Sequence, residues 1–148
     1  MNLYQTLKHY FGYDTLRPGQ QDLMEGILNG SDVLGIMPTG AGKSLCYQVP
    51  ALMLPGITIV ISPLISLMSD QVKALNQAGV HAAYINSSLT ENQIRAALLY
   101  AAQGQYKIIY VAPERLNTMR FLDFACRADI SMVTVDEACL LYTSPSPR

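Results

Sequence analysis

The chain has 148 residues, of which 50% are hydrophobic and 14% are charged, and its formal net charge is -1 at pH 7. This length suits one domain with a substantial core, and the charge balance excludes an overall basic field that would attract nucleic acid. Three cysteines, far apart in the sequence, are too few for a disulfide framework. No signal peptide and no apolar run of about 20 residues is present, so we expect a cytoplasmic protein without a membrane anchor.

Two helices are predicted before residue 30. Residues 2–11 place apolar side chains three and four positions apart, which is typical of an amphipathic helix, and Gly12 ends it. Residues 18–29 begin with proline and end with Asn29-Gly30, which are the usual signals for the start and the end of a helix.

Apolar strands then alternate with helices. Between Leu45 and Ile94 the only charged residues are Asp70, Lys73 and Glu91, which favours strands buried on both faces of a sheet. The alternation predicts βαβ units and an α/β fold, with a mostly parallel sheet covered by helices on both faces. Strands are expected at 33–37, 57–61, 80–85, 107–111 and 131–135, and helices at 43–54, from the 62–63 turn to Ala78, and from Thr90 to 102.

Four of these strands are followed by unusual polar or glycine-rich segments. They are residues 39–44, 62–63, 113–115 and 136–137. In open α/β sheets, ligands bind beyond the carboxyl ends of the strands. The sequence therefore predicts a functional site at that edge of the sheet.

A glycine-rich loop is the strongest motif in the chain. Glycines let backbone N–H groups turn toward phosphate oxygens, and the helix that follows adds the positive end of its dipole. Lys43 can reach the β- and γ-phosphates, and the Ser44 hydroxyl can coordinate Mg²⁺. The alternative is a glycine-rich strand-to-helix turn without a ligand. The predicted phosphate-binding residues are Pro38, Thr39, Gly40, Ala41, Gly42, Lys43 and Ser44.

An acidic pair, Asp136-Glu137, follows the last predicted strand. Beside a phosphate loop, the first carboxylate would hold Mg²⁺ opposite Ser44, and the second would orient the water that attacks the γ-phosphate. We therefore assign Lys43 and Glu137 as candidate catalytic residues, and Ser44 and Asp136 as candidate metal ligands. Two acids at a strand end are also a common surface feature, so the motif depends on the loop upstream.

Segments on both sides of the loop make the chain resemble RecQ helicases. Residues 11–13 (Phe-Gly-Tyr) and 16–20 (Leu-Arg-Pro-Gly-Gln) are similar to the motif that this family carries before its phosphate loop, which itself has the superfamily 2 form Pro-Thr-Gly-x-Gly-Lys-Ser. The resemblance implies that Tyr13 and Arg17 flank the adenine ring and that Gln20 reads its edge. Without it, Tyr13 and Arg17 would be interpreted as packing and as a solvated charge.

Two downstream segments extend the resemblance. Ser62-Pro63-Leu64, which continues as Ile-Ser-Leu-Met, and Pro113-Glu114-Arg115 are similar to family motifs that line the track of a single DNA strand. Such groups position a phosphate backbone without reading its sequence. By themselves, both segments would be plain strand-to-helix turns.

Together, these motifs over residues 10–138 imply a fold and an activity. The fold would be the RecA-like P-loop lobe, and the parent protein would be an ATP-dependent DNA helicase that unwinds in the 3′-to-5′ direction with ATP and Mg²⁺. An RNA helicase of the same superfamily and a non-catalytic nucleotide-binding domain are the alternatives. The Phe-Gly-Tyr and Ser-Pro-Leu-Ile-Ser-Leu segments favour RecQ. Protein partners are not indicated by the sequence.

The resemblance ends abruptly. The family reads Asp-Glu-Ala-His where this chain has Cys139, which brings the coupling of nucleotide state to DNA contact into question. We expect residues 1–139 to be an incomplete first motor lobe and 140–148 to be a non-native or disordered tail. Because ATP in a helicase sits between two lobes, we expect these residues alone to show negligible unwinding and very low ATPase activity.

Overall fold

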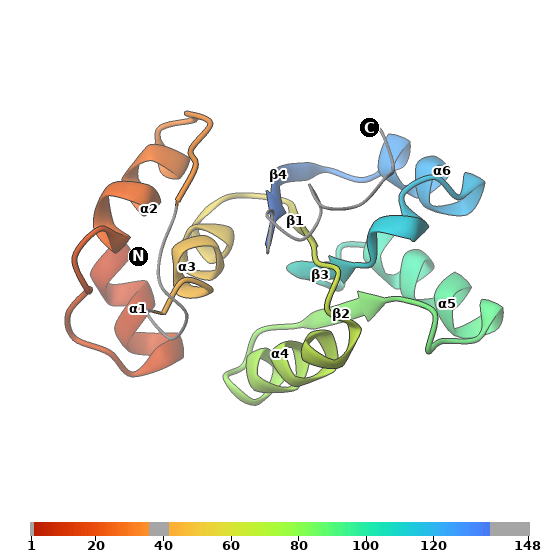
Figure 1. The fold of residues 1–148 in the computed structure, drawn as a ribbon, viewed down its shortest axis with the longest axis horizontal. Helices are drawn as coiled ribbons and strands as arrows, with labels where there is room; N and C mark the ends of the chain where they lie inside the picture. Colours follow the sequence, from red (N-terminus) through yellow and green to blue (C-terminus); the bar gives the residue numbers. More distant parts are fainter. Residues whose placement is uncertain (1, 36–41, 137–148) are drawn as a thin grey trace. The chain divides into compact units, whose positions relative to one another are not determined.

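The computed structural model describes residues 2–35 and 42–136. The chain divides into two compact units, Met1–Pro55 and Gly56–Arg148, and each is described by itself. The first unit contains three helices and the second contains a sheet with three further helices (Figure 1). The helices of the first unit are α1 (Leu3–Phe11), α2 (Gln20–Leu28) and α3 (Leu45–Met53).

Local signals define the helices of the first unit. Asn2 caps α1 through a capping box with Gln5, and Gly12 ends the helix at φ 77° in the left-handed region. Both α1 and α2 contact α3. Leu7, Met24 and Val49 meet in a small apolar core, in which all three side chains are completely buried. The two predicted N-terminal helices are therefore confirmed, with slightly shorter bounds.

The strand expected at residues 33–37 is absent from the part of that segment that the structure describes. Residues 33–35 have no regular secondary structure, and 36–37 lie outside the described residues. Val33 is 41% exposed and Leu34 is 78% exposed, so neither is part of a core. An apolar run becomes a strand only when another strand completes its hydrogen bonds. No described strand pairs with 33–35.

The second unit is built on a four-stranded sheet in the order β2-β3-β1-β4, in which every neighbouring pair is parallel. All four strands were predicted from the sequence, to within two residues at each end. The strands are β1 (Ile57–Ile61), β2 (Ala82–Ile85), β3 (Ile108–Val111) and β4 (Ile130–Val135). The helices are α4 (Ile65–Gln77), α5 (Glu91–Ala102) and α6 (Met119–Arg127), with a short 3-10 helix η1 (Pro113–Arg115).

Helices cover both faces of this sheet, as the α/β pattern predicts (Figure 1). Alternate residues of β1 and β3, such as Ile59 and Ile109, pack against α5 and α6 in the main core. α4 contacts β2 and buries Met68, Val72 and Leu75 outside that core. The Thr90 cap of α5 is also confirmed, since its hydroxyl accepts from the Gln93 N–H in a capping box.

Helix α6 was not predicted from the sequence. Thr118 caps it, with its hydroxyl accepting from the Phe121 N–H at 3.3 Å. Phe121 and Phe124, three residues apart, are buried against the main core and lie 5.7 Å apart between ring centroids. These were the available sequence signals, namely a capping threonine and an aromatic pair at helical spacing.

The amino ends of three strands crowd around Gly56. Its carbonyl accepts from Lys107 Nζ at 3.0 Å, and burial lowers the pKa of Lys107, partly opposed by the Asp129 carboxylate. A Cβ at Gly56 would lie 2.5 Å from the Asp129 carbonyl oxygen and 2.6 Å from Ser131 Oγ. Its φ of 78° is also in the left-handed region. Only glycine fits here.

Among the described residues, no helix is long and apolar enough to cross a membrane.

We predict that Gly56→Ala destabilises the second unit more than Gly79→Ala. Both glycines have positive φ, but a Cβ at Gly79 meets nothing within 4 Å. Gly79→Ala should therefore cost about 1 kcal/mol from backbone strain, and Gly56→Ala about 3 kcal/mol because backbone overlap is added. Urea unfolding followed by circular dichroism measures both. Equal costs would contradict the close approach at Gly56.

Candidate functional site

The carboxyl ends of the four strands lie in one hydrogen-bonded row. Ile61 pairs with Val111 and with Val135, and Val111 pairs with Ile85. The pairing continues for one residue beyond the strands. Ser62 N–H donates to Val111 O at 3.1 Å, Ala112 N–H to Ile85 O at 3.0 Å, and Asp136 N–H to Ile61 O at 2.9 Å.

This row brings three predicted segments to one edge of the sheet. Ser62 follows β1, Pro113 comes one residue after Ala112 beyond β3, and Asp136 follows β4. Ligands of parallel α/β sheets bind at this edge. The row therefore places the 62–64 segment, the 113–115 segment and Asp136 together, as the sequence predicted for a site at the strand ends.

The segment after β1 turns the chain into α4. Ser62 is 4% exposed, and its hydroxyl accepts from the Leu64 N–H at 3.3 Å. Pro63 and Leu64 are half-buried, and Leu64 is the N-cap of α4 without a side-chain cap. The Ser62 hydroxyl thus shapes the turn. The backbone and the apolar side chains of 63 and 64 are more accessible than the hydroxyl.

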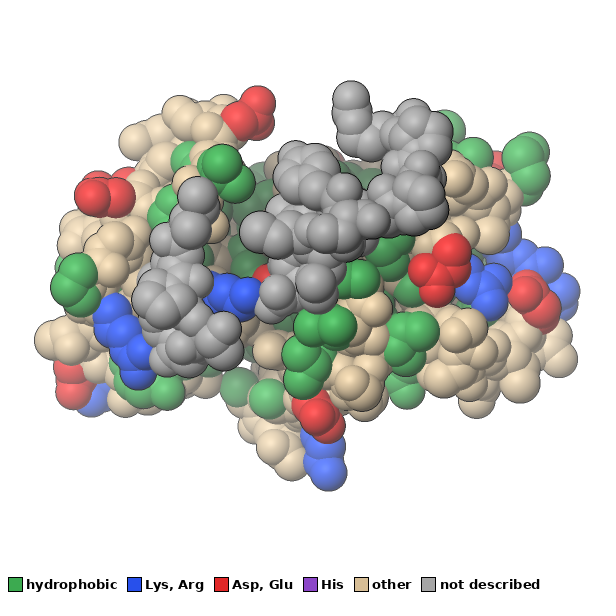
Figure 2. All heavy atoms as spheres, in the orientation of Figure 1, with side chains coloured by type: hydrophobic (Ala, Val, Ile, Leu, Met, Phe, Trp, Pro, Cys, Tyr) green, Lys and Arg blue, Asp and Glu red, His purple; other side chains and the backbone are tan. Residues whose placement is uncertain are grey.

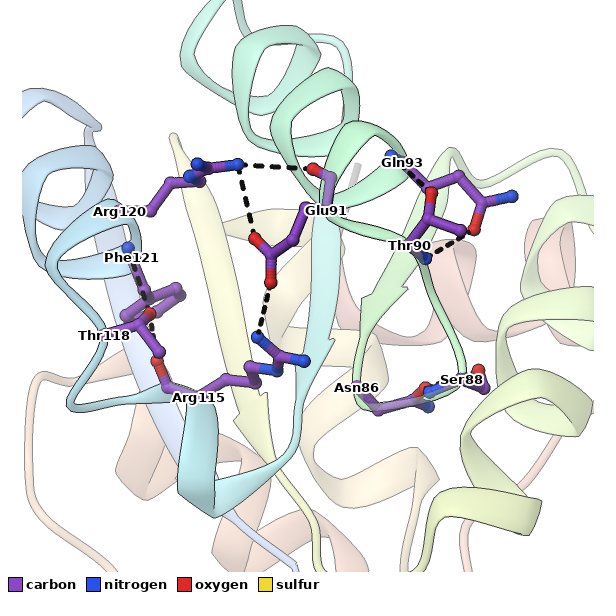
Figure 3. A network of polar contacts seen from close by, with 9 residues as sticks. All are labelled: Asn86, Ser88, Thr90, Glu91, Gln93, Arg115, Thr118, Arg120 and Phe121. Carbon is purple, nitrogen blue, oxygen red and sulfur yellow. Dashed lines mark hydrogen bonds and ion pairs between the residues drawn. The ribbon is translucent and has the colours of Figure 1, made fainter.

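The segment after β3 forms η1. Glu114 is exposed, whereas the half-buried Arg115 points toward Glu91 at the start of α5, with 3.5 Å between Arg115 Nη1 and Glu91 Oε1 (Figure 3). Arg120 from α6 reaches the other oxygen of the same carboxylate at 3.4 Å. Arg115 is therefore positioned by an ion pair that the sequence did not predict.

Asp136 lies half-buried immediately after β4. Its partner in the acidic pair, Glu137, is outside the described residues. In the described parts of the chain, no group of three or more His, Cys, Asp or Glu side chains could hold a metal ion. Mg²⁺ is commonly held by one or two carboxylates together with water and the phosphates of a bound substrate.

Only the end of the glycine-rich loop is described. Pro38, Thr39, Gly40 and Ala41 lie outside the described residues. Gly42 has φ 74°, and Lys43 and Ser44 form the turn that starts α3. No side chain caps this nine-residue helix, and its first turn has no acidic residue. Such a helix start fits an anion, because its N–H groups and dipole carry positive charge.

Gln20 connects the upstream motif to this loop. It is 2% exposed, its Oε1 accepts from the Arg17 N–H at 2.6 Å, and its Nε2 donates to the Gly42 carbonyl at 3.0 Å. A Cβ at Gly42 would lie 2.7 Å from Gln20 Nε2, so this approach also requires glycine. The sequence suggested a contact from Gln20 to adenine; its contact with Gly42 is an addition that the sequence did not reveal.

Tyr13 and Arg17, the other two residues of the upstream motif, are exposed, with Tyr13 at 56%. A phenol ring and a guanidinium group can each stack on a planar ligand. Cys46 on α3 is buried, and burial raises the pKa of its thiol, which favours the protonated form and a role in packing.

The sequence reasoning missed the end of β2. Asn86 follows that strand and is 1% exposed. Its Oδ1 accepts from the N–H and the hydroxyl of Ser88, at 2.9 and 2.5 Å. Nδ2 lies 3.4 Å from Met68 Sδ. The signal was the same as at the other strands, since polar residues follow an apolar run directly.

We predict that Gln20→Met destabilises the first unit by roughly 2 kcal/mol, because the Arg17 N–H and the Gly42 carbonyl lose a buried partner. Hydrogen exchange at the Arg17 amide should accelerate, and thermal unfolding should report the lost stability. The control is Gln21→Met, where the replaced amide makes only exposed contacts, with Tyr4 and Glu25, and the change should stay within about 0.5 kcal/mol. Unchanged exchange at Arg17 would contradict the bridge.

Comparison with known proteins gives a consistent result. The family described as DEAD/DEAH box helicase matches residues 17–144. The ATP-dependent DNA helicase RecQ of Bacillus subtilis is 49% identical over 133 residues, which are 89% of this chain and 22% of that protein. That of Haemophilus influenzae is 46% identical over 132 residues, 89% of this chain and 21% of that protein. A putative ATP-dependent RNA helicase R290 of Acanthamoeba polyphaga mimivirus is 42% identical over 142 residues, which are 92% of this chain and 25% of that protein.

The chain thus spans about a fifth of the length of the RecQ relatives that it matches. The family match begins at Arg17 and includes the glycine-rich loop, all four strands and Asp136. The matched residues thus contain the whole parallel sheet and the segments at the ends of its strands. On this evidence, the chain belongs to the DEAD/DEAH box helicase family.

Proposed function

We propose that this chain is part of the ATP-binding motor lobe of a RecQ-type DNA helicase, and that the full-length parent couples ATP hydrolysis to unwinding in the 3′-to-5′ direction. The row of strand ends is the observation that carries this proposal. It brings Ser62, Ala112 and Asp136 to one edge of a parallel sheet, where α/β proteins bind their ligands. The similarity to proteins named ATP-dependent DNA helicase supports the same assignment.

Nucleotide binding is proposed for the first unit. The loop from Pro38 to Ser44 would surround the phosphates, and Lys43 would neutralise the β- and γ-phosphates as a point charge. Tyr13 and Arg17 would stack on adenine. Gln20 would contact the edge of the base while holding Gly42, and would thereby connect the base-binding segment with the phosphate loop.

Hydrolysis is proposed to use the acidic pair. An Mg²⁺ ion would supply positive charge that offsets the negative charge developing on the phosphates during hydrolysis. Ser44 and Asp136 would hold that ion, and Glu137 would orient and deprotonate the attacking water. The donors suit the ion, because a hydroxyl and a carboxylate are the hard oxygen ligands that Mg²⁺ prefers.

A single DNA strand is proposed to lie across the 62–64 and 113–115 segments. Leu64 precedes α4, so the first backbone N–H groups of that helix are presented there, and Arg115 in η1 adds a cation. An RNA strand is the second candidate, because one similar protein is named a putative RNA helicase. DNA and RNA share the phosphate backbone, so the proposed backbone contacts fit both. Affinities for matched DNA and RNA oligonucleotides, measured in parallel, distinguish the two candidates.

We predict that Lys43→Ala weakens binding of a fluorescent ATP analogue by roughly 10- to 100-fold, because a charge-assisted contact to the phosphates is lost. Titration followed by fluorescence, with Mg²⁺ present, measures the affinity. Lys73→Ala is the matched control, since it removes an exposed lysine from α4 and should leave the affinity unchanged. If Lys43→Ala binds as tightly as the unaltered chain, the proposed phosphate loop is wrong.

A further inference from the structure

Glu91 holds two arginines that come from different elements. Its Oε1 lies 3.5 Å from Arg115 Nη1, and its Oε2 lies 3.4 Å from Arg120 Nη1. Arg120 Nη1 also donates to the Glu91 carbonyl at 3.2 Å. Figure 3 shows both guanidinium groups pointing toward the first residue of α5, one from η1 and the other from the start of α6.

Arg120 occupies an electrostatically unfavourable place. It is the second residue of α6, and a cation in the first turn of a helix is opposed by the helix dipole. The first turn of α6 has no acidic residue to compensate. The only acid that a described contact gives Arg120 is Glu91, from another helix. An anionic ligand at this position would offset the unfavourable interaction between the Arg120 charge and the helix dipole.

The cluster of Glu91, Arg115 and Arg120 carries two positive charges and one negative charge. The start of α5 at Glu91 and the start of α6 beside Arg120 add the positive ends of two dipoles. Over α5 and α6 more generally, basic and acidic side chains lie next to one another (Figure 2). The cluster therefore provides a local excess of positive charge on a surface of mixed sign.

The two ion pairs are long and partly exposed to solvent. The Glu91 side chain is 64% exposed, that of Arg120 is 39% exposed and that of Arg115 is 21% exposed. Ion pairs that solvent screens in this way contribute little to stability. Arginine binds phosphate through two parallel hydrogen bonds, which are stronger than one long contact to a carboxylate. A phosphate can thus displace Glu91 from either arginine.

We propose that Arg120 and Arg115 bind phosphates of the same single DNA strand, and that Glu91 is the carboxylate which those phosphates displace. This inference rests on the proposed function, because Arg115 follows β3 at the edge where the strand is proposed to lie. It extends the DNA track from the strand ends onto α6. Glu91 holds both guanidinium groups in place until a strand arrives.

The test measures binding of a fluorescein-labelled oligothymidine to the 148-residue chain by anisotropy over a series of NaCl concentrations. Arg120→Gln should weaken binding by roughly five- to tenfold and reduce the slope of log affinity against log salt by about 0.7, the value for one phosphate contact with a single strand. Arg127→Gln is the matched control. It lies on the same helix, pairs with Asp123 at 3.4 Å, and should change neither quantity.

Glu91→Gln tests the exchange itself. Removing the competing carboxylate raises the charge of the cluster by one, so binding should tighten by roughly threefold and the salt slope should increase. Circular dichroism of each variant verifies the fold. The inference is overturned if Arg120→Gln leaves binding unchanged, as Arg127→Gln should, or if Glu91→Gln weakens binding. A loss of affinity in Arg115→Gln alone would support only the proposed DNA track. If the unaltered chain binds no oligothymidine at low salt, the proposed DNA track is itself overturned.

Discussion

The hydrogen bonds that join the ends of the parallel strands are the constraint on which the candidate site depends. They pair Ile61 with both Val111 and Val135, and they continue through Ser62 and Asp136. A shift of one residue would turn every side chain of a strand to the other face and would move the following turn along the edge. Segments distant in sequence therefore share an edge because the register of three strands is fixed.

Glycine has a similar role at two points where backbones approach closely. Gly56 allows the amino ends of the strands to meet beside Asp129, and Gly42 allows Gln20 to reach its carbonyl. In both cases the requirement is spatial as well as conformational, since φ is positive and a Cβ would overlap a neighbour. The sheet and the end of the glycine-rich loop thus depend on residues that contribute no side chain.

The surface beyond the strands is organised by charge rather than by packing. Arg115 and Arg120 reach Glu91 from η1 and α6, and all three lie in short connections or helix starts. Glu91 and Arg120 are exposed and Arg115 is half-buried, so solvent weakens their ion pairs. An anionic ligand that binds the arginines can therefore change these ion pairs without disturbing the core, which is formed mainly by β1, β3, α5 and α6.

The sequence by itself determined the α/β class, the four described strands, five of the six described α-helices and the segments at the strand ends, because caps, apolar runs and turns are local signals. It missed α6, and of the strand that it predicted at 33–37, residues 33–35 have no regular secondary structure. Only the tertiary structure decided the strand order, the Gln20 bridge to Gly42 and the pairing of Glu91 with two arginines. Each joins residues distant in the chain, and no local pattern encodes which partner a strand edge or a charged side chain will meet.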